Sequence, residues 1–205
     1  MVELLSIGIH ACRRAAIEPD DFVVILGAGK LGLAILTVLK TTAAGTIVST
    51  DARDYRLDIA RKIGADVCIN STKTDVPRAI AELTGGRGAD RVFEAVGHYE
   101  KAASGLAPVA EAAQIVRNAG RVIVLGQGPD PEPVFWRPFV WKEATLVTSR
   151  VTLGEFPRTI SMLEKGRLVT APLITHEMPL DFAPDAVRML VEGRDEAVKV
   201  LVRIE

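Results

Sequence analysis

The sequence has few of the residues that hold metals or form disulfides. Its 205 residues include 2 cysteines and 3 histidines. Cys12 and Cys68 stand far apart, without the paired spacing of a zinc knot or of a redox motif. A disulfide framework is therefore excluded, and we expect a protein of a reducing, cytoplasmic compartment.

An excess of one charge and long apolar runs are also missing. The 25 lysines and arginines nearly balance 26 aspartates and glutamates, so composition gives no electrostatic case for binding nucleic acid or an anionic membrane. No apolar run reaches the roughly 18 residues of a transmembrane helix. The N-terminus shows no basic region followed by an apolar signal core. The length allows one sizeable α/β core with an appendage.

What is present is concentrated in one stretch. Val23 to Leu26 is a short apolar run that leads into a glycine-rich turn, Gly27-Ala28-Gly29-Lys30-Leu31-Gly32, and then into an apolar helix. Asp51 follows Gly32 by 19 residues, at the end of a second strand-like run. A strand, Gly-x-Gly-x-x-Gly, a helix and an acidic residue at this distance are typical of a dinucleotide-binding unit.

Each part of this pattern has a physical task. Gly27 allows the tight turn, Gly29 lets the backbone approach a pyrophosphate, and Gly32 lets helix and strand pack closely. The helix N-terminus offers free N–H groups to the phosphates. Asp51 accepts hydrogen bonds from the adenosine ribose and repels a 2′-phosphate, so we expect NAD rather than NADP. The nearby Arg53 weakens this preference slightly.

Related nucleotide and dehydrogenase motifs are excluded by inspection. A P-loop requires glycine at position 24, which is Val24, and Ser or Thr after Lys30. A methyltransferase turn requires glycine in place of Leu31. Short-chain dehydrogenases are disfavoured because neither Tyr55 nor Tyr99 is followed four residues later by lysine.

The rest of the chain alternates apolar runs with helical patterns. We expect a first strand from Phe22 and five more at Thr46–Thr50, Val67–Ile69, Asp90–Glu94, Gly120–Gly126 and Thr145–Ser149. Helices are expected at Val2–Ala16, from the glycine-rich turn to about Thr41, at Asp54–Ile63, and at Lys101–Asn118 with breaks at Gly105 and Pro108. This order predicts an α/β fold, a doubly wound six-stranded parallel sheet of the Rossmann type.

A shorter tail follows the sheet. It shows a helix between Pro157 and Gly166, an extended piece at Leu173–Met178, a helix capped by Asp181 that runs to about Glu192, and an alternating strand at Val198–Ile204. The chain thus divides into a lead-in helix (1–18), a dinucleotide-binding domain (19–166) and a C-terminal helix-strand tail (167–205).

Several segments point to one family. They are Val2 to Arg14, Gly27 to Gly32, Asp51 with Arg56 five residues later, Gly64-Ala65-Asp66, Glu94-Ala95-Val96-Gly97, Gly120-Arg121-Val122 and Leu173-Ile174-Thr175-His176. In this order they resemble the zinc-dependent medium-chain dehydrogenases of the alcohol dehydrogenase superfamily, in the sorbitol and threonine dehydrogenase branch. The resemblance spans nearly the whole chain, although Lys101 to Ala119 is longer than the sorbitol dehydrogenase pattern.

The resemblance implies roles for particular residues. Gly29, Lys30 and Leu31 would contact the pyrophosphate of NAD, and Arg56 would lie along the adenine. The nicotinamide half would be flanked by Ala95, Val96, Gly97, Leu125, Gly126 and Gln127, with Ser149 and Arg150 near the nicotinamide ribose and the substrate. The alternatives are a solvated helix residue for Arg56 and a surface ion-pair partner for Arg150.

The family's chemistry implies a zinc ion that polarises an alcohol or polyol, which then gives hydride to NAD. Such a site needs three protein ligands and an open position. Among Cys12, Cys68, His10, His98 and His176, only His10 and Cys12 have close spacing, and two residues apart on a helix they point in different directions. We therefore expect that the family's N-terminal zinc-binding domain is not in this polypeptide, and that the chain alone is inactive.

Three further expectations depend on the resemblance. Glu3 is similar to the family's glutamate beside the zinc, although Leu4 replaces a usual proline; the alternative is a simple helix-start residue. The aromatic stretch Phe135–Trp141 either borders the sheet edge through which such dehydrogenases dimerise, roofs the substrate cleft, or is a patch beneath the turn with Pro129, Pro131 and Pro133. A homo-oligomer through the sheet edge is expected.

Two other functions stay open. The first is a stand-alone NAD-binding or sensing module whose output is association rather than catalysis. The second is a zinc-independent quinone reductase of the same superfamily, which is disfavoured because the turn here lacks the Ala-rich Gly-Gly-Val-Gly form usual in that branch.

Overall fold

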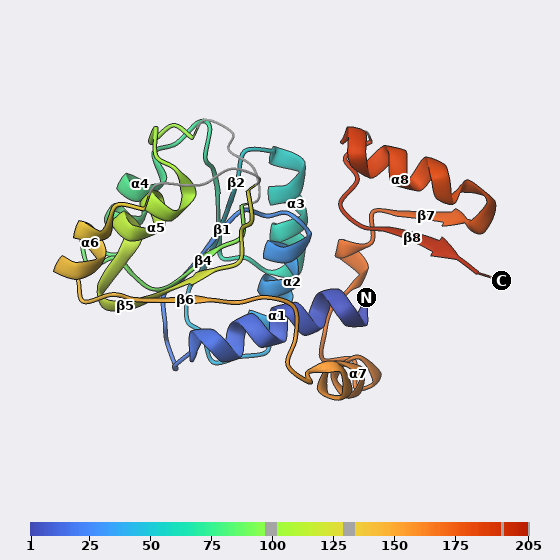
Figure 1. The fold of residues 1–205 in the computed structure, drawn as a ribbon, viewed down its shortest axis with the longest axis horizontal. Helices are drawn as coiled ribbons and strands as arrows, with labels where there is room; N and C mark the ends of the chain where they lie inside the picture. The colour runs from blue at the N-terminus through green and yellow to red at the C-terminus, as the bar shows by residue number, and fades with distance from the viewer. Residues whose placement is uncertain (97–101, 129–133, 194, 205) are drawn as a thin grey trace.

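The computed structural model describes residues 1–96, 102–128, 134–193 and 195–204. Six parallel strands lie in the order β3-β2-β1-β4-β5-β6 (Figure 1). Their bounds are Val23–Leu26 (β1), Ile47–Asp51 (β2), Val67–Asn70 (β3), Ala89–Glu94 (β4), Val116–Val124 (β5) and Thr145–Thr148 (β6). The predicted Rossmann sheet is confirmed, and its strand order reverses between β1 and β4.

Helices cover both faces of this sheet. One face packs against α1 (Val2–Ala15), α2 (Lys30–Leu39) and α3 (Asp54–Ile63). The other packs against α4 (Val76–Leu83), α5 (Pro108–Ile115) and α6 (Trp136–Trp141). Along β1, Val23 and Ile25 belong to the first core, while Val24 and Leu26 belong to the second. All four side chains are buried, as expected for a parallel strand with both faces covered.

The lead-in helix α1 packs directly on α2. A Cβ atom added at Gly8 would lie 2.8 Å from the carbonyl oxygen of Ala34, so the two helices approach closely there. The helix ends at Ala15, and Ala16 takes the left-handed conformation with φ of 50°. The predicted helix over Val2–Ala16 is thus confirmed to within one residue.

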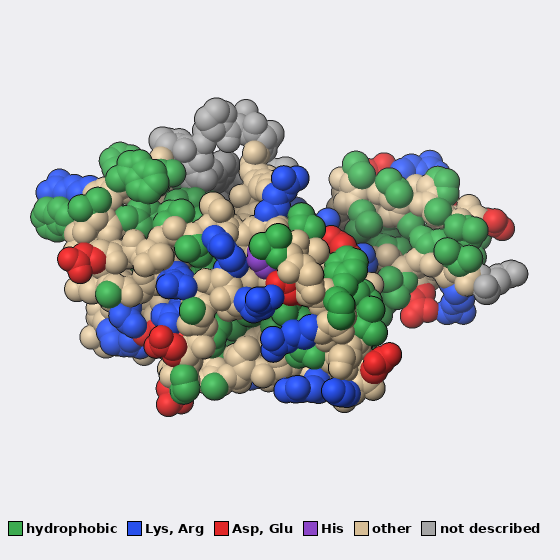
Figure 2. Space-filling model, turned by 60° about the horizontal axis from the view of Figure 1, so that its bottom comes forward, with side chains coloured by type: hydrophobic (Ala, Val, Ile, Leu, Met, Phe, Trp, Pro, Cys, Tyr) green, Lys and Arg blue, Asp and Glu red, His purple; other side chains and the backbone are tan. Residues whose placement is uncertain are grey.

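The tail forms a small unit beside the main sheet. It contains a 3₁₀ turn η1 (Ala171–Leu173), β7 (His176–Pro179), a 3₁₀ turn η2 (Leu180–Phe182), α8 (Ala183–Glu192) and β8 (Val200–Arg203). The helix before it, α7 (Phe156–Glu164), packs against α1 in the first core. Strands β7 and β8 pair in parallel as a separate sheet. Leu173 is fully buried in the main core, which anchors the unit. Figure 2 shows hydrophobic side chains over this part, at the right.

The prediction of a helix over Lys101–Asn118 is wrong at both ends. The helix begins at Pro108, which is preorganised for the first helical position, and ends at Ile115. Val116 already pairs with Ala89 in the sheet, and the register then shifts before Arg121 pairs with Arg91. The extra residues form an irregularity in β5 that includes Ala119, with φ of 54°.

Two smaller predictions also fail. Asp181 does not cap α8, because it lies in η2 and Phe182 takes the cap position without a side-chain hydrogen bond. Leu173 belongs to η1 rather than to an extended segment.

The aromatic stretch forms the short helix α6. Phe139 is buried, whereas Phe135, Trp136 and Trp141 are 71%, 61% and 74% exposed. The alternative in which the aromatic stretch is a patch beneath a turn is therefore wrong for these three side chains. Pro129, Pro131 and Pro133, which were to form that turn, lie outside the described residues. Among the described helices, none has the length and apolar character needed to cross a membrane.

Candidate dinucleotide-binding site

The first and third glycines of the turn are required by the protein itself. Gly27 has φ of 92°, and a Cβ atom there would lie 3.0 Å from the carbonyl oxygen of Ala95. A Cβ atom at Gly32 would collide with the carbonyl oxygen of Gly27. The strand-to-helix turn therefore excludes any larger residue at either position.

Gly29 is different, because none of the described residues requires a glycine there. Its φ is −73°, a conformation open to any residue. Among the described residues, a Cβ atom would meet only Nη1 of Arg56, at 3.9 Å, so they leave the space above Gly29 open. A ligand that approaches the backbone would fill that space, which fits the pyrophosphate role of the second glycine.

The N-terminus of α2 opens onto the same space. Gly29 is its N-cap residue, no side chain caps it, and its first turn holds no acidic residue. The N–H groups of the first helical turn therefore lack side-chain acceptors, and the positive end of the helix dipole adds to their attraction for an anion. Lys30 is exposed at the first position of the helix.

Asp51 ends β2 beside this turn. Its Oδ2 accepts a hydrogen bond from the Ala28 N–H at 2.8 Å, and its Oδ1 accepts one from the Arg53 N–H at 3.0 Å. Nη1 of Arg56 lies 3.5 Å from the same carboxylate, and the guanidinium sits over the ring of Tyr55 at 5.7 Å from its centroid. Asp51 is thus held, largely buried, next to the glycine-rich turn.

These residues line one cleft of about 540 Å³ at the carboxyl ends of the strands. Of the residues predicted from the sequence, the cleft brings together Gly27, Gly29, Lys30, Leu31, Asp51, Arg56, Ala95 and Val96. Gly97 lies outside the described residues. The cleft sits where the strand order reverses, which is the usual ligand position in an open α/β sheet.

Apart from Ala95 and Val96, the described residues predicted on the nicotinamide side do not line this cleft. Leu125 is buried, and Gly126 packs on Glu94, whose Oε2 accepts its N–H at 3.1 Å. Gln127 and Arg150 are exposed. Ser149 is buried, and its Oγ finds no hydrogen-bond partner within the described part of the chain. Their roles remain predictions.

Glu3 also lies outside the cleft lining, exposed in the first turn of α1. Its role beside a zinc ion remains a prediction.

The cleft contains residues that sequence reasoning missed. Glu111 of α5 and Lys199, just before β8, both line it. A single carboxylate between Val109-Ala110 and Ala112-Ala113 was a signal for Glu111, since an acidic residue in an apolar helical stretch is unusual. No pattern in the sequence places Lys199 beside the glycine-rich turn, because only the tertiary fold brings the tail there.

A catalytic zinc does not fit the residues present. Across the described ranges, no group of three or more His, Cys, Asp or Glu side chains is arranged to hold a metal ion. Burial raises the pKa of the Cys12 thiol and of the Cys68 thiol, which disfavours the thiolate that binds zinc. The Nδ1 atom of His10 is paired with Glu155 at 3.0 Å.

Comparison with known proteins identifies the family. The family profile described as "Zinc-binding dehydrogenase" matches residues 31–165. The chain belongs to the zinc-binding dehydrogenase family. The predicted resemblance is therefore confirmed.

Individual relatives agree with this assignment. Sorbitol dehydrogenase of Bacillus subtilis is 30% identical over 98% of this chain and 56% of its own length. Erythritol/L-threitol dehydrogenase of Mycolicibacterium smegmatis is 32% identical over 97% of this chain and 53% of its own length. The chain spans about half the length of these curated relatives.

Solved structures show the same relationship. An Escherichia coli CFT073 alcohol dehydrogenase complexed with cofactor NADH has a TM-score of 0.89 and 27% identity, covering 100% of this chain and 58% of that one. The 2R,3R-butanediol dehydrogenase of Bacillus subtilis has a TM-score of 0.88 and 25% identity, covering 100% of this chain and 56% of that one.

Proposed function

We propose that this chain is the NAD-binding domain of a zinc-type alcohol or polyol dehydrogenase. The observation that carries the proposal is the open space above Gly29, at the N-terminus of α2 and beside Asp51. The turn excludes side chains at Gly27 and Gly32 for its own packing, whereas glycine at position 29 is needed only if a ligand approaches the backbone.

In this proposal the chain's residues bind and orient NAD. The N–H groups at Gly29, Lys30 and Leu31 hold the pyrophosphate, Asp51 accepts the ribose hydroxyls, and Arg56 lies along the adenine. The nicotinamide half lies toward Ala95, Val96, Gly97, Leu125, Gly126, Gln127, Ser149 and Arg150. When bound, NAD supplies the hydride acceptor for oxidation of a secondary alcohol.

Lys199 adds a positive charge to the wall of the same cleft. An ammonium group there favours the anionic pyrophosphate, and it comes from the opposite end of the chain.

The proposed activity of the chain by itself is nucleotide binding without alcohol oxidation. The described residues offer no zinc site, so no catalytic step is assigned to them. Glu3 would act only beside a zinc held elsewhere. Association into a homo-oligomer through the edge strand β6, and a cytoplasmic location, belong to the same proposal. The free state of both cysteines supports the latter.

The test is a titration of the chain with NADH and, separately, with NADPH, followed by the fluorescence of the reduced nicotinamide. We expect saturable binding of NADH and weaker binding of NADPH. Mixing the chain with NAD and sorbitol is expected to produce no NADH. Absence of binding by either nucleotide would overturn the proposal.

A further inference from the structure

Glu111 is a carboxylate in an unusual position. It lies on α5, is 5% exposed, and lines the same cleft as Gly29 and Asp51. Burial raises the pKa of Glu111, and the nearby Asp75 raises it further. A side chain of this kind is costly to bury unless hydrogen bonds or a counter-charge compensate it.

Among the described residues, only one of its two oxygens has a hydrogen-bond partner. Ser104 Oγ donates a hydrogen bond to Oε1 at 2.7 Å and accepts one from the Leu106 N–H at 3.3 Å. For Oε2, the described residues supply no hydrogen-bond donor, and no cation forms an ion pair with Glu111 there. Since Oε2 is not sealed inside the protein and Glu111 lines the cleft, this oxygen is open to a donor on a bound ligand.

The position of Glu111 in the cleft determines which part of a bound nucleotide would contact this side chain. The cleft runs from Gly29, at the pyrophosphate position, past Asp51, at the ribose position. Beyond Asp51 it is lined by Ala52, Ser71, Ala102, Leu106 and Pro108, which are small or apolar. The N–H of Ala103 donates to the carbonyl oxygen of Ser71 at 2.7 Å, so the segment before α5 reaches across to the end of β3. This part of the cleft has the small and apolar lining expected of a base pocket.

We infer that Glu111 accepts a hydrogen bond from the exocyclic amine of the adenine and makes the pocket specific for that base. The inference rests on the proposed function, since it names the base recognised at the same site. A carboxylate only accepts hydrogen bonds, so it pairs with the N6 amine of adenine. Hypoxanthine carries a carbonyl oxygen at that position, and two acceptors facing each other repel. Ser104 positions the carboxylate.

The test compares NADH with its hypoxanthine analogue, reduced nicotinamide hypoxanthine dinucleotide, in which a carbonyl oxygen replaces this amine and the adjacent N1 carries a hydrogen. Both are titrated by the fluorescence of the nicotinamide. We expect the unmodified chain to bind NADH about tenfold more tightly, the effect of one hydrogen bond to a charged group. In Glu111→Gln the preference is expected to fall towards one, because an amide offers both a donor and an acceptor.

Ser104→Ala is the matched control. It removes the hydrogen bond that positions the carboxylate but keeps the carboxylate itself. If the role of Glu111 is purely structural, Glu111→Gln and Ser104→Ala should each lower the affinity for both nucleotides equally. Equal affinity of the unmodified chain for the two nucleotides would overturn the inference and leave the proposed function standing. Failure of NADH itself to bind would overturn both. The comparison in the unmodified chain does not depend on the folding of any variant.

Discussion

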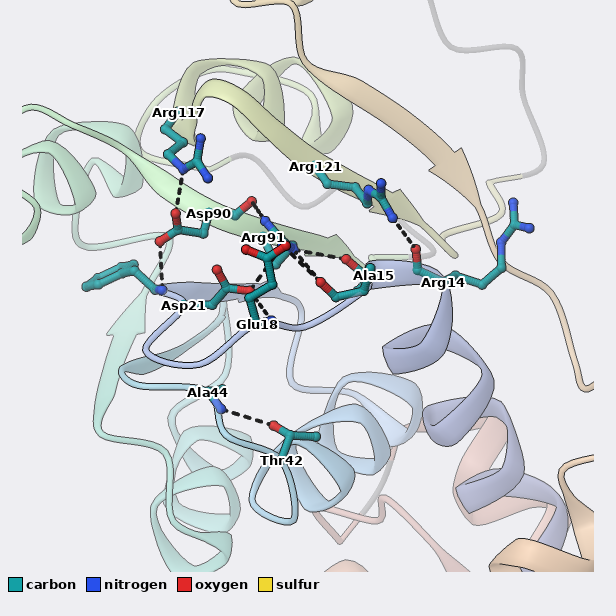
Figure 3. Close-up of polar contacts among 12 residues, drawn as sticks. Arg14, Ala15, Glu18, Asp21, Thr42, Ala44, Asp90, Arg91, Arg117 and Arg121 are labelled. Atoms are coloured by element: carbon teal, nitrogen blue, oxygen red, sulfur yellow. Dashed lines mark hydrogen bonds and ion pairs between the residues drawn. The ribbon is translucent and has the colours of Figure 1, made fainter.

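The guanidinium of Arg91 lies 3.3 Å from the carboxylate of Asp21, and both side chains are buried (Figure 3). Arg91 comes from β4, and it also donates to the carbonyl oxygens of Ala15 and Ala16, each at 2.9 Å. It therefore satisfies the C-terminal end of α1, whose last carbonyl groups have no partner within the helix. Arg91 is thus one of the side chains that join the lead-in helix to the sheet, together with Arg121 of β5, which donates to the carbonyl oxygen of Arg14 at 3.1 Å.

Replacement of Arg91 by methionine is expected to lower the free energy of unfolding by about 3–5 kcal/mol, because the buried Asp21 loses its counter-charge and two carbonyl oxygens at the end of α1 lose their donor. Urea unfolding measures the change. Glu18 also faces Arg91, at 3.6 Å, but its side chain is 71% exposed. Glu18→Gln is therefore the control, with an expected change below about 1 kcal/mol. Equal effects of the two substitutions would contradict this account.

Alanine at Gly29 and alanine at Gly32 are expected to act differently. A methyl group at Gly29 points into open space, so thermal stability is kept while NADH affinity falls at least about tenfold, as the pyrophosphate can no longer approach. At Gly32 the methyl group collides with the Gly27 carbonyl, so the protein is destabilised. Thermal unfolding and NADH titration of both variants separate the effects. Undiminished NADH binding in Gly29→Ala would place the nucleotide elsewhere.

Asp51→Asn is expected to shift the choice of nucleotide. The amide still offers one oxygen to the Ala28 N–H, but the negative charge that repels a 2′-phosphate is gone, while Arg53 and Arg56 remain in the cleft. NADH affinity should fall and NADPH affinity should rise, with a change in their ratio of about tenfold or more. Titration with both nucleotides at two salt concentrations measures it. An unchanged ratio would show that Asp51 does not face the ribose.

We expect Glu155 to make the free energy of unfolding depend on pH under acidic conditions. Glu155 is buried and joins α7 to α1 through His10 and Arg13. Burial by itself would raise its pKa, but hydrogen bonds from Thr152, His10 and the Leu153 N–H outweigh it and lower the pKa from 4.5 to about 2. A lowered pKa gives stability that is present above pH 4.5 and is lost as the pH falls towards 2.

Glu155→Gln is therefore expected to be less stable than the unmodified chain by about 1–3 kcal/mol at pH 7, with the difference shrinking from pH 4.5 downward. Urea unfolding between pH 7 and pH 3 follows it. Glu164→Gln, on the exposed side of α7, is the control and is expected to leave the pH profile unchanged. A constant difference across this range would contradict the assignment.

The fold could largely be predicted because its signals are local. The apolar run before Gly27, the spacing to Asp51 and the glycine at position 64, with φ of 114° after α3, each act within a few residues. Residues Val116 to Asn118 could not be assigned to a helix or to a strand, since the spacing of the apolar residues up to Val116 fits a helix as well as a strand. Only pairing with Ala89, far away in the sequence, decides between them.

The sequence predicted the part of the site that is formed by the backbone of one motif. It did not predict the part that is formed by side chains from elements distant in the sequence. Gly27, Gly29 and Asp51 belong to one βαβ unit, so one motif predicts all three. Glu111 and Lys199 reach the cleft from α5 and from the tail, and no spacing rule connects these elements to the turn.

The central place of β1 in the sheet has a consequence for the order in which the chain can fold. β1 pairs on one side with β2 and on the other with β4, where Val24 lies opposite Val92. During synthesis, β1 therefore leaves the ribosome long before its second neighbour exists, and its apolar edge stays open meanwhile. Such long-range parallel pairing is intrinsically slow. We therefore expect nascent chains that end before Ala89 to expose this edge and to be prone to aggregate, whereas chains that include Glu94 can close the middle of the sheet.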